Sequence, residues 1–292
     1  PSDSVRIWPI AWNKRGPMNP DLTCSAYDNC RVPWGATHAD NWRIVREYPY
    51  VSGMFIWTGF DYLGEPTPYP WPARSSYFGL IDLAGFPKDG YYFYQAEWTS
   101  RPMLHLFPHW NWQSGQVIDV WAYTNQGAVE LFLNGRSLGK KEKTRDTFQL
   151  VWRVPFEPGF LKAVAYKEGS AVLEQRMQTA GAPAKIVLTA DRDRIKADGR
   201  DLSFVTVEVV DSAGVLAPRA DNLVQFSLQG PAVIAGVDNG LQTSMEPFKA
   251  DHRMAFNGKC LCVIQTRDEP GVIVLTARSE GLQEAVLQII SE

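Results

Sequence analysis

The sequence predicts a mainly β chain in which two immunoglobulin-like β-sandwiches follow a βα segment. From Arg101 onward, apolar residues recur at every second position in short runs separated by turn residues, which is typical of sandwich strands. Before that point, the apolar run 54–57 ends at Thr58-Gly59, and a long aromatic loop and a helix follow. A buried strand leading through a loop into a helix is the βα unit of a parallel α/β fold.

Composition and charge narrow the class of protein. The chain has 292 residues, 45% hydrophobic and 21% charged, which is enough apolar material for two or three domain cores. A net charge of −3 does not indicate the basic surface that binds nucleic acid, and no apolar run approaches the length of a membrane span. Nine of the eleven tryptophans lie before residue 113, a skew that suits a carbohydrate site in the first segment.

The first segment is expected to contain a long loop, a helix and a strand. Residues 1–36 lack periodicity and are rich in Pro, Gly, Asn and Asp, so we predict a functional loop. Thr37 with an acidic residue three positions later is typical of a helix N-terminus, and apolar residues at helical spacing extend to Pro49. These signals predict helix 37–48, leading into strand 51–57.

The segment after the long loop begins with a second helix and then changes to a period of two. Asp89 is placed to cap a helix at 90–98. The Asn134-Gly135 dipeptide predicts a type I′ turn inside a β-hairpin. The strands and the hairpin of the first sandwich are expected at 116–124, 129–139, 148–154, 160–166 and 172–178.

A linker of small residues, 180–183, separates this sandwich from a second one. Seven further strands are expected at 185–190, 202–210, 224–228, 233–237, 259–266, 272–277 and 284–290. That number of short strands with intervening turns predicts an immunoglobulin-like sandwich. The predicted domains are 1–99, 100–182 and 183–292.

Cysteines and histidines predict no metal site. Cys260 and Cys262 face the same side of a strand, and neither their spacing nor that of the histidines matches a zinc pattern. Cys24 and Cys30 form a disulfide in an oxidising compartment or remain free thiols, and the sequence leaves both open. We expect no metal and no cofactor.

Two stretches carry a specific family resemblance. Residues 53–65 (GMFIWTGFDYLGE) and 77–88 (YFGLIDLAGFPK) resemble the last βα unit of the catalytic (β/α)8 TIM barrel in glycoside hydrolase family 2, β-galactosidase type. The segments 100–182 and 183–292 resemble the two β-sandwich domains that follow the barrel in one branch of that family. The resemblance therefore covers nearly the whole chain, in order, and implies the C-terminal part of a β-galactosidase-like enzyme.

The resemblance also implies which catalytic groups this chain lacks. A retaining glycosidase uses two carboxyl groups about 5 Å apart, which in this family are glutamates on strands four and seven of the barrel. The chain has no Asn-Glu pair of the kind that marks the first of them, and it starts at Pro1 without an initiator methionine, as an interior cut or a processed end would. We expect both glutamates upstream of Pro1 and no catalytic residue within this chain.

Trp57 is the leading candidate for substrate binding. By the resemblance, it is the tryptophan that ends barrel strand eight and carries the sugar of the −1 subsite. A pyranose presents a face of C–H bonds, and an indole offers the largest flat apolar surface to meet it. The alternative interpretation is a core tryptophan at a strand end.

Five other polar residues of the first segment are weighed as site residues. Asp61 lines the site or braces its loop, and for Glu65 the structural role is favoured. These two carboxylates lie on one loop, which rarely places a catalytic pair on opposite sides of a sugar. Asp28 and Asn29 resemble the tip of the loop that follows strand seven and could reach a sugar hydroxyl. Arg74 binds a carboxylate or polar sugar group, or forms a structural salt bridge.

A non-catalytic carbohydrate-binding or scaffold module is the competing function. Trp110, Trp112 and Trp121 could form its binding surface, although core packing is the commoner use of such residues. In either case the partner is a carbohydrate, and an enzyme also needs the remainder of the barrel chain. We expect no nucleic-acid or membrane partner, and a homo-oligomer is left open. A periplasmic or extracellular location suits a polysaccharide-degrading branch, with the cytoplasm as the alternative.

Overall fold

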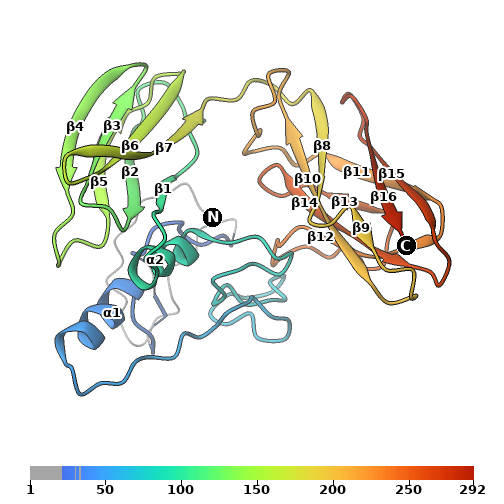
Figure 1. The fold of residues 1–292 in the computed structure, drawn as a ribbon, viewed down its shortest axis with the longest axis horizontal. Coiled ribbons are helices and arrows are strands. Elements are labelled where there is room, and N and C mark those ends of the chain that lie inside the picture. Colours follow the sequence, from blue (N-terminus) through green and yellow to red (C-terminus); the bar gives the residue numbers. More distant parts are fainter. Residues whose placement is uncertain (1–21, 30, 33) are drawn as a thin grey trace. The chain divides into compact units, whose positions relative to one another are not determined.

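The computed structural model describes residues 22–29, 31–32 and 34–292, and strands dominate it (Figure 1). The chain divides into two compact units, Pro1–Thr179 and Ala180–Glu292, which are described separately. This division falls at the start of the predicted linker 180–183. The further boundary near residue 100 stays a prediction, because the helical segment and the first sandwich share one unit.

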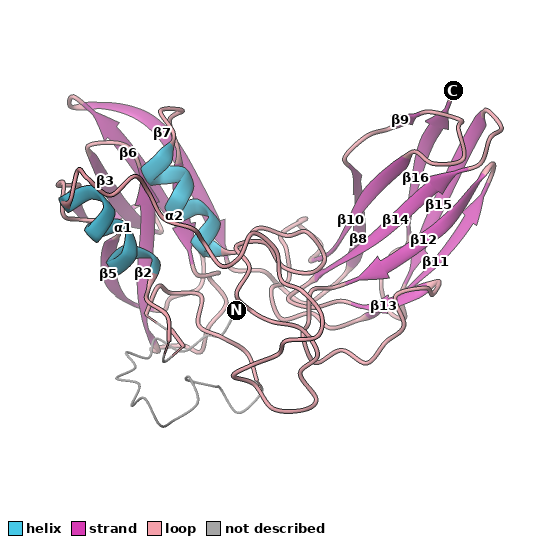
Figure 2. Cartoon of the chain, turned by 90° about the horizontal axis from the view of Figure 1, so that it is seen from below, coloured by secondary structure: helices cyan, strands magenta, loops and turns pink. Residues whose placement is uncertain are grey.

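Within the described residues, the helices α1 (His38–Glu47) and α2 (Asp89–Trp98) belong to the first unit and are coloured cyan in Figure 2. Thr37 caps α1 as predicted, because its hydroxyl accepts from the backbone N–H of Asp40 at 3.2 Å. The predicted cap of α2 is wrong by one residue. Lys88 is the N-cap, and Asp89 is the first helical residue, whose carboxylate is bound to the His105 ring at 2.7 Å.

The predicted strand 51–57 is not a strand, since within the described residues nothing pairs with it as a ladder. Its burial nevertheless alternates. Met54 and Ile56 pack against a buried aromatic cluster, whereas Phe55 and Trp57 are exposed at 104% and 72%. Period-two alternation with one covered face is the geometry of a strand that lacks its neighbours.

The first β-sandwich follows the helices and has two sheets, with strand orders β1-β2-β5 and β4-β3-β6-β7. Its strands are β1 (Leu104–Phe107), β2 (Val117–Thr124), β3 (Ala128–Leu133), β4 (Arg136–Glu142), β5 (Leu150–Pro155), β6 (Phe160–Lys167) and β7 (Ser170–Gln178). The predicted hairpin is confirmed: Asn134 and Gly135 have φ of 50° and 83°, the two positive values that a type I′ turn requires. Leu131 and Trp152 lie in the core between the sheets.

A second buried cluster joins the helices to the outer side of this sandwich. Phe93 of α2 meets Tyr123 of β2 edge-on, with ring centroids 5.7 Å apart. The ring centroid of Phe148 lies 5.6 Å from that of Phe93. Tyr27 belongs to the same cluster and donates its hydroxyl to the Asp119 carbonyl at 2.7 Å. The helical segment is therefore fixed to the sandwich by a hydrophobic core of its own.

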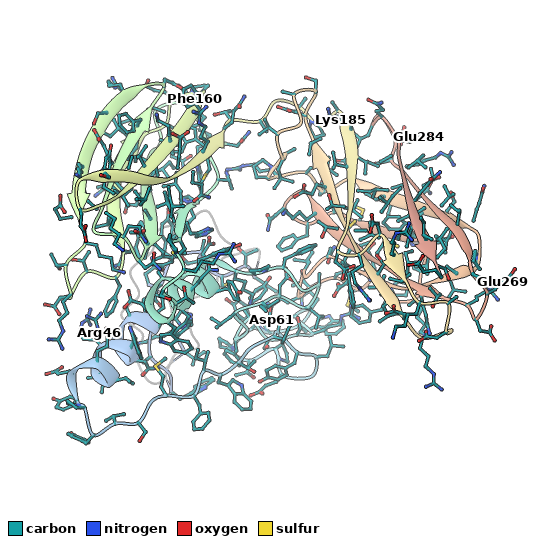
Figure 3. All side chains as sticks on the ribbon, viewed as in Figure 1. Arg46, Asp61, Phe160, Lys185, Glu269 and Glu284 are labelled. Atoms are coloured by element: carbon teal, nitrogen blue, oxygen red, sulfur yellow. The ribbon has the colours of Figure 1, made fainter. Side chains whose placement is uncertain are left out.

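Glu97, near the end of α2, adds an ionic contact at this junction. Its carboxylate, 8% exposed, accepts from Lys143 Nζ at 2.7 Å, from Trp42 Nε1 at 2.9 Å and from Arg46 at 3.3 Å. Figure 3 shows Arg46 on α1. One carboxylate thus ties both helices to the segment that follows β4.

Replacing Glu97 with alanine is expected to lower the free energy of unfolding of the first unit by about 3 kcal/mol, because two half-buried cations lose their counter-charge. Scanning calorimetry of the chain measures the transition of this unit. Glu47→Ala removes an exposed carboxylate from α1 and serves as the control. An equal loss in both variants would contradict the assigned role.

The second unit is a sandwich of two sheets, with strand orders β12-β14-β10-β8 and β13-β11-β15-β16-β9. Its strands are β8 (Lys185–Ala190), β9 (Arg194–Ile195), β10 (Leu202–Val210), β11 (Leu223–Gln229), β12 (Ala232–Asp238), β13 (His252–Met254), β14 (Lys259–Thr266), β15 (Gly271–Arg278) and β16 (Ala285–Ser291). All seven predicted strands are present, and β9 and β13 are additional. Cys260 and Cys262 point into the core together, and burial raises the pKa of the Cys262 thiol to about 12.

Candidate functional site

The candidate site is built on residues 57–88, where two backbone segments run side by side. Thr58 exchanges backbone hydrogen bonds with Phe78 and Leu80, at 2.9 and 3.0 Å. Further along, the Ser76 N–H donates to the Tyr62 carbonyl at 2.9 Å, and the Gly64 N–H donates to the Arg74 carbonyl at 3.0 Å. These bonds hold the long aromatic loop against the segment that leads into α2.

Gly79 makes this close approach possible. A Cβ at this position would lie 2.1 Å from the backbone nitrogen of Asp61 and 2.4 Å from the carbonyl carbon of Phe60. Those contacts involve backbone atoms that cannot move aside. Any side chain at residue 79 would therefore separate the two segments.

Trp57 lies at the start of this paired region and presents its indole to solvent. Its Nε1–H donates to the Tyr62 hydroxyl at 3.0 Å, and the two rings are perpendicular with centroids 6.2 Å apart. Phe55 in the same segment is also exposed, so exposure within this chain does not separate a sugar platform from a core tryptophan. The sugar contact itself stays a prediction.

Asp61 is buried, with its side chain only 1% exposed. Its Oδ1 accepts from Lys88 Nζ at 2.7 Å and from the Gly79 N–H at 2.8 Å. Burial raises the pKa of Asp61, and the Lys88 ammonium counteracts this rise. These contacts brace the loop, and a contact between Asp61, labelled in Figure 3, and a sugar stays a prediction.

Glu65 is exposed and accepts a hydrogen bond from the Tyr62 hydroxyl. Asp61 and Glu65 thus have separate partners and do not form a pair facing a common substrate. Tyr62 and Lys88 are the two residues here that the sequence patterns do not single out. Their positions in the sequence could have identified them, since Tyr62 lies between the two carboxylates and Lys88 ends the second stretch that resembles the family.

Asp28 lies at the N-terminus of α1. Both Asp28 carboxylate oxygens accept from the first amides of α1, His38 N–H at 2.9 Å and Ala39 N–H at 2.7 Å. A carboxylate in this position stabilises the helix N-terminus. The Asn29 amide is buried, and its oxygen and nitrogen have no hydrogen-bond partner in the described part of the chain. A sugar contact for either residue stays a prediction.

Arg74 and Asp82 belong to the second of the paired segments. Arg74 is half-buried, and its carbonyl accepts from the Gly64 N–H. Asp82 accepts from the Phe86 N–H at 2.8 Å, which closes a turn in this segment. A contact between Arg74 and a sugar stays a prediction.

The surface proposed for a non-catalytic binding module is not present. Trp110, Trp112 and Trp121 are 1%, 9% and 8% exposed and pack inside the first unit.

Cys24 is a free thiol, and its predicted partner Cys30 lies outside the described residues.

Among residues 22–29, 31–32 and 34–292, acidic, histidine and cysteine side chains form no group that could hold a metal ion. No helix in the same residues is long and apolar enough to span a membrane.

Two family models match the chain. Residues 186–288 match the glycoside hydrolase family 2 C-terminal domain 5, which covers the second sandwich. Residues 115–173 match a domain of unknown function, DUF4982, which covers most of the first.

Relatives match over a larger part of the chain. It is 57% identical over 293 aligned residues to the β-galactosidase BoGH2A of Bacteroides ovatus, covering 100% of this chain and 34% of that protein. It is 39% identical to a putative β-glucuronidase of Formosa agariphila, over 84% of this chain and 24% of that protein. A β-glycosidase crystal structure from Bacteroides vulgatus superposes with a TM-score of 0.86 at 38% identity, over 91% of this chain and 34% of that one.

These matches define the class of protein as a glycoside hydrolase. The chain belongs to glycoside hydrolase family 2 and corresponds to the C-terminal portion of the relatives that it matches. It spans between about a quarter and a third of the length of the relatives cited above.

Proposed function

We propose that the intact protein is a retaining glycoside hydrolase that acts on terminal β-galactosidic bonds, and that this chain forms one wall of its sugar site. The observation that carries the proposal is the indole of Trp57, 72% exposed at the end of a segment that alternates like a strand without neighbours. An exposed indole fixed at its Nε1 offers the apolar face that a pyranose needs. The 57% identity to a β-galactosidase favours a galactoside over a glucuronide.

The catalytic pair is proposed to come from protein outside this chain. A retaining mechanism needs an acid/base and a nucleophile about 5 Å apart across the scissile bond. Asp61 is buried against Lys88, and Glu65 is bound to Tyr62, so neither carboxylate is placed for that chemistry. The remaining barrel strands would also pair with residues 51–57 and cover Phe55.

Nitrophenyl glycoside assays of the intact protein test this function. We expect hydrolysis of the β-galactoside to exceed that of the β-glucuronide, and proton NMR to show β-galactose as the first product, since retention preserves the anomer. The isolated 292-residue chain, checked for folding by circular dichroism, should show no turnover above the blank. An inactive intact protein would refute the proposal, and an active isolated chain would return Asp61 and Glu65 to the catalytic role.

A further inference from the structure

Trp57, Tyr62 and Glu65 are joined by consecutive hydrogen bonds, which we call the indole relay. The Trp57 indole can only donate, and it donates to the Tyr62 hydroxyl at 3.0 Å. The Tyr62 hydroxyl has a single proton, which it gives to Glu65 Oε2. Both bonds therefore point in one direction, from the indole toward the carboxylate.

The backbone beneath the middle of the relay is fixed. The Tyr62 N–H donates to the Ser76 hydroxyl at 3.3 Å, and the Ser76 N–H donates back to the Tyr62 carbonyl at 2.9 Å. Ser76 is fully buried, so this anchor is not at the surface. The Trp57 indole, in contrast, is mostly exposed, and its bond to Tyr62 selects one ring orientation among those that its side-chain torsions allow.

The relay contributes little to folding. Trp57 and Glu65 are exposed. A hydrogen bond between solvent-accessible groups only replaces the hydrogen bonds that these groups would make to water, so its net contribution to stability is small. Partial burial and the bond to Glu65 raise the pKa of the Tyr62 phenol. Tyr62 therefore remains a protonated donor across the neutral range.

We propose that Tyr62 and Glu65 are positioning residues that orient the Trp57 indole and enrich its face in electron density for the transition state of glycoside hydrolysis. This inference rests on the proposed function and adds two residues to its site. Hydrogen bonds in a chain polarise one another, so a carboxylate at the far end shifts electron density toward the indole. The glycosyl transition state carries positive charge, and an aromatic face attracts a cation.

The relay should therefore act more strongly on the transition state than on the bound substrate. An interaction that strengthens only in the transition state lowers kcat and kcat/KM together when it is removed. A residue that merely supports the fold would instead change thermal stability.

A double-mutant cycle in the intact protein tests the relay. Tyr62→Phe should lower kcat and kcat/KM by about tenfold, the upper range for one hydrogen bond, with an unchanged melting temperature. Trp57→Phe lacks the indole N–H, so adding Tyr62→Phe to it should change kcat by less than about twofold. Glu65→Gln keeps an acceptor without the charge and should lower kcat by about threefold.

Tyr91→Phe is the matched control, because Tyr91 is an exposed tyrosine on α2 away from the relay. Equal losses from Tyr62→Phe with and without Trp57→Phe would overturn the inference, and so would wild-type kinetics in Tyr62→Phe. A crystal structure of the intact Tyr62→Phe protein gives a readout independent of activity. A rotated indole is expected, and an unchanged one would refute positioning even if the proposed β-galactosidase activity itself were absent.

Discussion

The variant Trp57→Ala of the intact protein is expected to lose about 100-fold in kcat/KM while keeping its melting temperature. Removing the indole takes away the apolar face on which a distorting sugar rests, and a contact worth about 3 kcal/mol in the transition state corresponds to that factor. The fold should survive, because Trp57 lies outside the buried clusters of the first unit and, on the proposed function, faces the sugar cleft. Steady-state kinetics and thermal unfolding of the one variant decide the outcome.

Trp71→Ala provides a control with the same exposure. Trp71 is also 72% exposed, but it lies in the proline-rich part of the loop. We expect its replacement to change kcat/KM by less than about threefold, since no relay orients it. If Trp57→Ala unfolds the protein but leaves activity per folded molecule intact, Trp57 is a core residue and the platform interpretation fails.

The sequence predicted the second sandwich most closely, for a physical reason. Strands β8, β10 and β14 match their predicted bounds residue for residue, because each has a core-facing side that makes alternation visible. Strand β1 escaped prediction because both of its faces are covered. Leu106 lies in the sandwich core, and Phe107 lies in the aromatic cluster beneath the helices, so no polar face remains to show a period of two.

The site could be predicted only where its cause was local. Trp57 stands out because it ends an apolar run before Thr58-Gly59. The role of Asp61 could not be chosen, since it depends on Lys88, 27 positions away, and on the close approach at Gly79. The prediction of a strand at 51–57 was wrong for a related reason. A strand needs neighbouring strands to pair with, and the described residues provide none at this position.

Arg253 provides the largest expected effect on stability. Nothing in the sequence distinguishes this basic residue of β13, yet its side chain is completely buried in the second unit. Its guanidinium donates to the carbonyls of Val237 at 2.6 Å and Pro247 at 3.0 Å, and to the Ser244 hydroxyl at 3.2 Å. Glu246 lies 3.5 Å away as the counter-ion.

Arg253→Ala should therefore lower the free energy of unfolding of residues 180–292 by about 4 kcal/mol, as expected when one partner of a buried ion pair is removed. The loss combines a cavity with carbonyls left without donors in a buried place. Arg253→Met fills most of the cavity and should still cost about 2 kcal/mol, because the carbonyls stay unpaired. Urea unfolding of this unit, which has its own core, measures both values.

Arg200→Ala is the matched control, since Arg200 is an exposed arginine of the same unit. Its loss should stay within about 0.5 kcal/mol, as for most surface substitutions. A fully stable Arg253→Met would show that Arg253 only fills space and that the hydrogen bonds to Val237 and Pro247 contribute nothing net. A loss in Arg200→Ala comparable to that in Arg253→Ala would trace the effect to net charge and not to the buried contacts.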